Sequence, residues 1–193
     1  MLVVWTGCGS VLRVRLDPLA SPELVHDFHQ CAGSLPYLQY LGGLIPLGSD
    51  EVIALSTSSE EALIVSLDGA TSEPTGSGEG FSSGVFLPRM GPIAASGSGR
   101  FWWRSKPRTW EIVATALGSL PLSMTSWQDG FAAGTEAGQV LLYSPGFGVC
   151  TAGTTIGPHN VHVVIAQKAG LLVASSQIMG STCMSVLSKP EPN

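Results

Sequence analysis

The main pattern in this sequence is a short apolar run, a small polar turn and a second apolar run, and it occurs five times along the chain. In the clearest copy the turn Glu136–Gly138 joins the runs Phe131–Thr135 and Val140–Ser144. β-Branched and aromatic residues in the runs, with Gly and Ser in the turns, are typical of β-hairpins. The five predicted hairpins join residues 3–6 to 11–17, 52–57 to 63–68, 93–96 to 101–103, 131–135 to 140–144, and 171–175 to 183–187.

The hairpins recur at a nearly constant spacing. They begin near positions 3, 52, 93, 131 and 171, a period of roughly 40 residues, which is typical of four-stranded propeller blades. Additional apolar segments flank the hairpins, so each repeat is predicted to contain an inner strand, a central hairpin and an outer strand. Ser21–His29 starts with Ser, Pro and Glu, which also suits the first turn of a helix. The predicted inner segments are 37–41, 85–87, 122–127 and 161–165, and the predicted outer segments are 23–28, 110–116 and 148–154.

The pattern predicts an all-β fold, with residues 1–193 forming a single β-propeller-like domain of about five four-stranded repeats, whether or not the ring is complete. Residues 69–84 are rich in Gly and Ser and poor in apolar residues, which predicts a long flexible loop between the second and third repeats. A β-sandwich or barrel with accidental periodicity is the competing fold. The predicted repeat units are 1–36, 37–84, 85–120, 121–157 and 158–193.

Composition limits the classes of function. The chain is 44% hydrophobic and only 12% charged, so it needs extensive burial, either internally or against neighbours. A net charge of −5 disfavours sequence-independent nucleic-acid binding. No apolar run approaches the roughly 18 residues of a membrane span. The N-terminal apolar run lacks a basic flank and is broken at Gly7, which disfavours a signal peptide and favours an intracellular location.

Three short motifs resemble chemical sites but lack the required context. His26–Cys31 contains two His and a Cys, fewer ligands than a structural zinc site needs. Gly80–Gly84 matches the G-x-S-x-G string without the strand-to-helix turn of a nucleophile elbow. Gly76–Gly80 lacks the Lys of a phosphate-binding loop. The sequence therefore predicts no catalytic residue, no metal site and no cofactor. Four dispersed cysteines without a CxxC pair are predicted to be small buried side chains: Cys8, Cys31, Cys150 and Cys183.

One segment combines basic and aromatic side chains. Residues 100–110 contain four of the nine Lys and Arg residues and three of the five Trp residues. Arg and aromatic residues are the usual anchors of protein interfaces, and the same mixture can stack single-stranded RNA. A strand with Trp in the core and basic residues in a solvated turn is the structural alternative. The predicted partner-binding residues are Arg100, Trp102, Trp103, Arg104, Lys106, Arg108 and Trp110.

The passage Ser126–Ser144 resembles a blade of the WD-repeat propeller family, in which a strand ends in Gly-Thr or Ala-Ser and an Asp-Gly turn lies nearby. Leu16-Asp17 and Leu67-Asp68 resemble the family's closing Trp-Asp dipeptide, with Leu in place of Trp. The other three copies lack this Asp, and the Gly-His pair that opens many family blades is also missing. The resemblance implies a β-propeller that serves as a rigid platform for protein partners.

We therefore predict a non-catalytic WD-repeat-like scaffold that mediates protein–protein interactions as a subunit of a larger assembly. Common rings of this family need roughly 300 residues, so the chain is a five-bladed ring, a partial propeller completed by another chain, or a fragment. A chain embedded in a larger assembly is favoured, because open sheet edges are costly when left bare. The alternatives are a β-sandwich or barrel binding module and, from another class, a propeller-borne enzyme with a central-channel site. For that site the predicted inner segments offer Tyr37, Tyr40, Met124 and His162.

Overall fold

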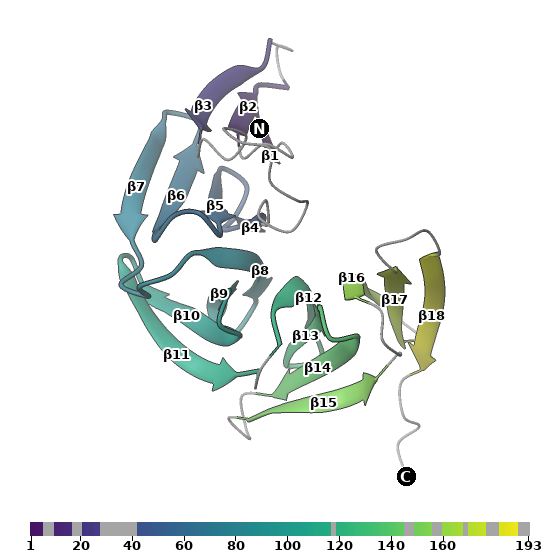
Figure 1. Ribbon diagram of the computed structural model, residues 1–193. Coiled ribbons are helices and arrows are strands. Elements are labelled where there is room, and N and C mark those ends of the chain that lie inside the picture. The colour runs from purple at the N-terminus through teal and green to yellow at the C-terminus, as the bar shows by residue number, and fades with distance from the viewer. Residues whose placement is uncertain are drawn as a thin grey trace.

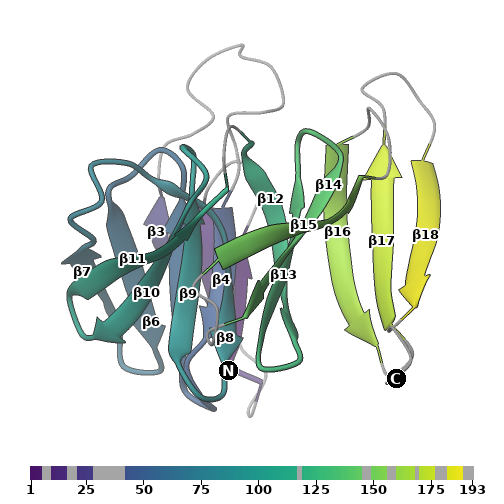
Figure 2. The same ribbon diagram turned by 90° about the horizontal axis from the view of Figure 1, so that it is seen from below.

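The computed structural model describes residues 1–5, 10–16, 21–27, 42–116, 119–144, 149–155, 160–167, 170–176 and 182–188. Over these residues the chain forms eighteen β-strands and no helix. The strands build five antiparallel sheets that follow one another around an open arc (Figure 1). Figure 2 shows the same sheets from below, standing side by side.

The three internal sheets each have four strands, and the first and fifth sheets each have three within the described residues. The first sheet contains β1 (Leu2–Trp5), β2 (Ser10–Val14) and β3 (Glu23–Asp27). The second contains β4 (Gly42–Pro46), β5 (Glu51–Ser56), β6 (Glu61–Ser66) and β7 (Ala70–Pro74). The third contains β8 (Phe81–Leu87), β9 (Gly91–Ser96), β10 (Arg100–Lys106) and β11 (Thr109–Thr115). The fourth contains β12 (Pro121–Trp127), β13 (Gly130–Thr135), β14 (Gln139–Ser144) and β15 (Val149–Thr155). The fifth contains β16 (Asn160–Gln167), β17 (Gly170–Ser176) and β18 (Thr182–Ser188).

All five hairpins predicted from the apolar pattern are present. They are β1–β2, β5–β6, β9–β10, β13–β14 and β17–β18, and each pair is antiparallel. In the fourth sheet, for example, Phe131 lies opposite Tyr143 and Gly134 lies opposite Val140. The helix that Ser21–His29 also permitted is not formed over its described part, because Glu23–Asp27 pairs with β2 as a strand.

The predicted flexible loop at 69–84 is wrong. This stretch contains the outer strand β7 and the start of β8, so the third sheet begins at Phe81 and not at residue 85. Hydrogen bonds order the intervening turn: the Thr75 hydroxyl donates to the Glu60 carbonyl at 2.8 Å. Gly80 lies so close to the second sheet that an added Cβ would sit 2.4 Å from the Ser56 carbonyl oxygen. The inner strand of the second sheet is β4, whereas the predicted segment 37–41 lies outside the described residues.

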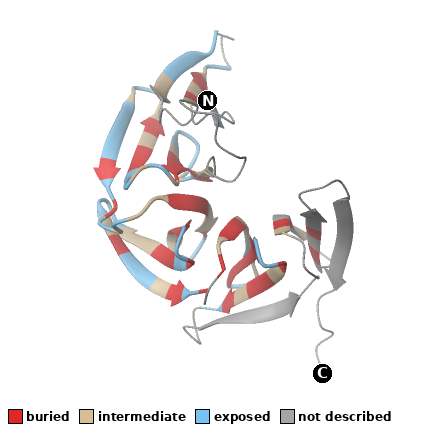
Figure 3. Ribbon diagram, in the orientation of Figure 1, coloured by how far each residue is buried: buried red, intermediate tan, exposed pale blue. Residues whose placement is uncertain are grey.

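The core is divided among the spaces between successive sheets (Figure 3). One apolar cluster lies in each of the four spaces, and no cluster spans more than two sheets. Each sheet is therefore covered by its neighbours on one or both faces, as expected for propeller blades. From the first space to the fourth, buried members include Val3, Val11 and Leu63; Ile53, Phe81 and Trp102; Phe101, Phe131 and Tyr143; and Val140, Val161 and Val173.

Two β-bulges recur among the sheets, although the second sheet has neither of them. One residue is skipped at the same point of three inner strands and at another common point of three outer strands. Positions in the sheets that share a bulge therefore have counterparts in one another. The skipped residues are Ser82, Leu122 and His162 in the inner strands, and Val25, Val113 and Gly153 in the outer strands.

Candidate partner-binding surface

The seven predicted partner-binding residues all lie on the outer hairpin of the third sheet, formed by β10 and β11 and their connecting turn. The structure separates them into buried residues that hold the second and third sheets together and exposed residues. The buried residues determine which side chains remain accessible at the surface.

Trp102 and Trp110 belong to the core between the second and third sheets, and each is only 7% exposed. The Trp110 ring packs against Phe81 with ring centroids 5.1 Å apart. Ile45 and Ile53 of the second sheet lie in the same cluster. These two indoles therefore stabilise sheet packing and are not available at the surface.

Arg104 forms a buried ion pair with Glu73 on β7 of the second sheet. Its Nε and Nη2 donate to the two carboxylate oxygens at 2.7 and 2.8 Å, and the side chains are 13% and 5% exposed. The Trp110 indole N–H donates to the same carboxylate at 3.2 Å, and the Arg108 backbone N–H donates at 3.3 Å. A bidentate, charge-assisted pair of this kind fixes geometry as well as contributing energy. The pair ties the second sheet to the third.

Arg13 makes a second polar tie between sheets that the sequence analysis missed. Its Nη1 donates to the carbonyls of Ser66 at 2.6 Å and Leu67 at 3.0 Å, and its Nη2 lies 2.8 Å from the Glu23 carboxylate. The side chain is 8% exposed. Arg13 lies two residues after the buried Val11 on β2, so both side chains are on the same face of the strand. This alternation is the signal in the sequence that could have placed Arg13 between the sheets.

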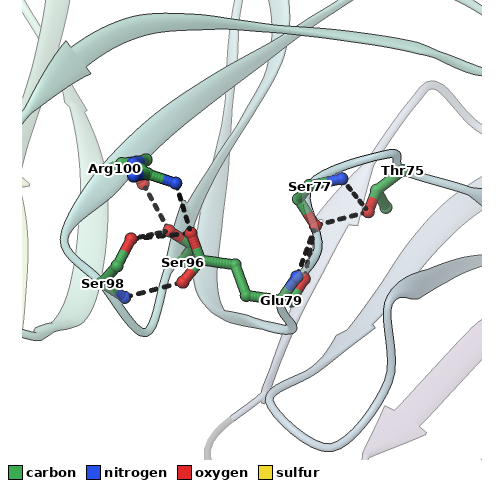
Figure 4. Close-up of polar contacts among 6 residues, drawn as sticks. All are labelled: Thr75, Ser77, Glu79, Ser96, Ser98 and Arg100. Atoms are coloured by element: carbon green, nitrogen blue, oxygen red, sulfur yellow. Dashed lines mark hydrogen bonds and ion pairs between the residues drawn. The ribbon is translucent and has the colours of Figure 1, made fainter.

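Arg100 lies at the opposite end of β10 from the turn and takes part in a capping network (Figure 4). Its Nη1 lies 3.7 Å from the Glu79 carboxylate, which also accepts the Ser98 backbone N–H at 2.9 Å and the Ser98 hydroxyl at 2.7 Å. Burial raises the pKa of Glu79, but hydrogen bonds from Ser98 and Ser96 and the charge of Arg100 together hold the pKa below its ordinary value. The ionised Glu79 carboxylate thus accepts the hydrogen bonds that hold the β9–β10 turn in place.

This network predicts acid sensitivity. Because the pKa of Glu79 is lower in the folded state than in the unfolded state, the ionised side chain stabilises the fold at pH values above the unfolded-state pKa. This stability is lost as the pH falls through the folded-state pKa. Glu79→Gln is expected to lower stability at neutral pH by about 1 kcal/mol and to flatten the fall in stability towards acid. Melting temperature measured from about pH 7 down to pH 3 checks this expectation. The exposed Glu60→Gln is the control, and equal pH profiles for both variants would contradict the capping role.

The exposed part of the segment is the tight turn between β10 and β11. Lys106 and Arg108 are exposed, and neither takes part in the ion pairs formed among the described residues. Arg108 has a φ of 61°, an uncommon conformation for a residue with a side chain, which its backbone hydrogen bond to Glu73 helps to hold. Trp103 is half-buried, and its indole N–H donates to the Met90 carbonyl. The turn therefore presents two cations on a rigid backbone.

The motifs that resembled chemical sites do not form such sites in the described residues. Ser82, the central residue of the G-x-S-x-G string, is fully buried on β8 and donates to the Pro121 carbonyl at 2.6 Å. The Gly76–Gly80 stretch is the turn that carries Glu79. No group of three or more His, Cys, Asp or Glu side chains within the described ranges could hold a metal ion. The part of His26–Cys31 beyond Asp27 lies outside them.

Of the four candidates for a central-channel enzyme, Met124 has a described side chain. Met124 packs against the core between the third and fourth sheets. Tyr37 and Tyr40 lie outside the described residues, and His162 is described only as a strand residue of β16. Cys8 and Cys31 lie outside the described residues as well, while Cys150 and Cys183 are strand residues of β15 and β18.

Three solved structures share this arrangement of sheets. The chain is similar to the β-propeller domain of Cps50 (Swd1) from Myceliophteria thermophila, with a TM-score of 0.62 and 10% identity over 90% of this chain and 58% of that one. It is similar to YCF48 bound to D1 peptide, with a TM-score of 0.67 and 11% identity over 99% and 62%. It is also similar to the extracellular domain of the putative hybrid two-component system BT4673 from B. thetaiotaomicron, with a TM-score of 0.62 and 12% identity over 99% and 26%. No protein-family model and no curated protein matches the sequence.

Together, the repeated sheets and these similarities define the fold as a β-propeller. The arc of five sheets is an incomplete ring, and the chain spans less than two thirds of the length of each of the three matched proteins. Within the described ranges, no helix has the length and apolar character needed to cross a lipid bilayer.

Proposed function

We propose that this protein is a non-catalytic scaffold that mediates protein–protein interactions as a subunit of a larger assembly. The observation that carries the proposal is the exposure of apolar side chains on both end sheets of the arc. Leu2 and Val4 of the first sheet are 47% and 37% exposed, and Val163 and Ile165 of the fifth are 41% and 47% exposed. Contiguous exposed apolar surface of this kind marks interaction sites. The YCF48 structure, which is bound to D1 peptide, supports the idea that a propeller of similar shape can hold a polypeptide.

The test is the behaviour of the full chain with and without its partners. Expressed alone and examined by size-exclusion chromatography with light scattering, the chain is expected to self-associate, because its apolar end faces are bare. Coexpression with the subunit that co-purifies from native cells is expected to yield a complex of fixed stoichiometry. A monodisperse monomer that captures no protein stoichiometrically would overturn the proposal.

The basic turn between β10 and β11 supplies a second partner contact in this proposal. The double substitution Lys106→Glu and Arg108→Glu is expected to weaken partner capture by about tenfold, since each charge reversal adds repulsion at a rim contact. Quantitative affinity purification at low and high salt measures the effect. The melting temperature is expected to stay unchanged, because both side chains are exposed.

A matched control keeps the change in net charge the same. Arg108→Glu alone and Arg89→Glu alone each reverse one exposed charge, and Arg89→Glu, which lies away from this turn and from the end sheets, is expected to leave capture unchanged. Equal losses in these two single variants would show a general charge effect and remove the turn from the proposal. Arg104 is unsuitable for this test, because Arg104→Glu would bury a second carboxylate beside Glu73 and perturb folding.

A further inference from the structure

The cations of the β10–β11 turn differ from most of the described arginines, which have acidic partners. Lys106 and Arg108 take part in none of the ion pairs formed among the described residues, although the chain carries a net charge of −5. Two such cations on an acidic chain form a local surface of opposite charge, which a negatively charged ligand complements. The paired arginines are Arg13 with Glu23, Arg89 with Asp129, Arg100 with Glu79 and Arg104 with Glu73.

The backbone of this turn holds Arg108 in a conformation that favours glycine. Arg108 has a φ of 61°, in the left-handed region that is unfavourable for a residue with a Cβ atom. The β9–β10 and β13–β14 turns use Gly99 and Gly138 for this purpose, with φ values of 79° and 75°. Gln128 is the one other described residue with a side chain at a positive φ. An arginine kept at a glycine-type position indicates that its side chain has a use at the surface.

The turn is also fixed to the core before any ligand arrives. The Arg108 backbone N–H donates to the Glu73 carboxylate at 3.3 Å, and Arg104 donates to the same carboxylate at 2.7 and 2.8 Å. Pro107, the other residue of the turn, has a φ fixed by its ring. The backbone that carries the two cations is therefore preorganised, which lowers the entropic cost of binding.

One exposed apolar side chain lies on the strand that follows this turn. Ile112 of β11, the outer strand of the third sheet, is 51% exposed (Figure 1). Among the described side chains, it is the only large apolar one so exposed on a strand of the three internal sheets. Ile112 follows the buried Trp110 by two residues, so both side chains are on the face turned to the second sheet. Arg108 and Ile112 are four positions apart, about 13 Å along an extended chain.

The burial of the indoles separates a peptide ligand from a nucleic acid. Trp102 and Trp110 are each only 7% exposed, and the half-buried Trp103 uses its N–H on the Met90 carbonyl. The segment therefore lacks the open aromatic platforms on which single-stranded bases stack. Two cations also provide far fewer phosphate contacts than the roughly six to ten of a typical nucleic-acid-binding protein. A peptide requires only carboxylates for the cations and an apolar side chain for Ile112.

We infer that the turn 106–109 and Ile112 form a binding site for an acidic peptide in an extended conformation. Carboxylates of the peptide pair with Lys106 and Arg108, and an apolar side chain about four residues further on packs against Ile112. This inference rests on the proposed scaffold function and specifies the ligand chemistry of its basic contact. The charged contacts select acidic residues, and the apolar contact sets their spacing along the peptide.

Fluorescence anisotropy of labelled peptides with the full chain tests the inference. Each probe peptide of about ten residues contains two adjacent glutamates and one leucine, placed about three, four or five residues further on. The peptide with the spacing of about four is expected to bind most tightly. Replacing its glutamates with glutamines is expected to weaken binding at least about tenfold, and high salt is expected to weaken it as well. A labelled oligouridylate is expected to bind more weakly than this peptide.

Arg108→Gly separates a role in binding from a role in folding. Glycine adopts the φ of 61° readily, so the melting temperature is expected to stay nearly unchanged while peptide affinity falls at least about fivefold. Arg108→Lys is expected to restore much of the affinity. Arg89→Ala, which removes an exposed arginine paired with Asp129, is the matched control and is expected to leave affinity unchanged. Ile112→Ser is expected to weaken the leucine peptide but not a peptide with serine in place of leucine.

Three results would overturn the inference. One is the absence of binding by all three leucine peptides at low salt, and another is equal affinity of the unmodified chain and Arg108→Gly. The third is tighter binding of the oligouridylate, which would assign the turn to a nucleic acid. Failure of any protein to co-purify with the unmodified chain would instead overturn the proposed function, and the peptide titrations would still decide the ligand of this site.

Discussion

Arg104→Met is expected to destabilise the fold by about 3–5 kcal/mol, the typical effect of removing one partner from a buried ion pair. The Glu73 carboxylate is 5% exposed and would lose both of its guanidinium hydrogen bonds. It would keep only the Trp110 indole N–H and the Arg108 backbone N–H, at 3.2 and 3.3 Å. Urea unfolding followed by tryptophan fluorescence measures the loss.

An exposed ion pair in the same part of the molecule provides the control. Arg89 lies 3.2 Å from Asp129, with the two side chains 79% and 70% exposed. Arg89→Met is expected to change stability by no more than about 1 kcal/mol, because water already solvates both charges. Replacing both members of the buried pair, by Arg104→Met with Glu73→Leu, is expected to recover much of the loss. Similar losses for Arg104→Met and Arg89→Met would contradict the assigned tie between the sheets.

The hairpins could be predicted from the sequence because their cause is local. A hairpin such as Phe131–Ser144 needs only two apolar runs and a turn that tolerates its backbone angles, and Gly138 supplies a φ of 75°. The spacing of the hairpins then indicated stacked sheets before any contact between sheets was known. The order of sheets around the arc follows from the same repeat, since each inner strand packs beside the next.

The polar ties between sheets could not be predicted, because their partners are distant in sequence. Glu73 lies in a stretch poor in apolar residues, and nothing nearby marks it as buried; its partner Arg104 is 31 residues away. The same pairing explains why 69–84 was wrongly predicted to be a flexible loop. In residues 69–84, ordered polar contacts take the place of the apolar contacts from which the hydrophobic pattern predicts strands.

For a related reason, the sequence could not separate the buried from the exposed side chains of residues 100–110. Tryptophan and arginine are enriched at interfaces and also serve as large packing groups, so composition alone cannot separate the two roles. Trp102 and Trp110 fill the space between sheets, while Lys106 and Arg108 of the adjoining turn remain exposed. The exposed apolar faces at the ends of the arc gave no signal in the repeat pattern. Their residues match those of covered sheets and differ only in lacking a neighbour.

Phe131→Ala is expected to cost about 3–5 kcal/mol, as is typical for truncation of a fully buried aromatic residue. Phe131 is 0% exposed and bridges the third and fourth sheets. Its ring centroid lies 4.8 Å from Phe101 of the third sheet and 4.8 Å from Tyr143, on which it stacks at an interplanar angle of 16°. Thermal and urea unfolding measure the loss, and Ile112→Ala, at a half-exposed position, is the control.

Hydrogen exchange adds a spatial test of the same variant. In a stack of sheets each one contacts only its neighbours, so the weakened interface is expected to lower protection first in residues 91–96 and 130–135. The first sheet lies two interfaces away and is expected to keep the protection it has in the unsubstituted chain. Uniform loss of protection from the first sheet to the fifth would contradict nearest-neighbour stacking. It would mean that the arc unfolds as one cooperative unit. Packing between distant sheets would then stabilise the end sheets as much as direct contacts with their own neighbours do.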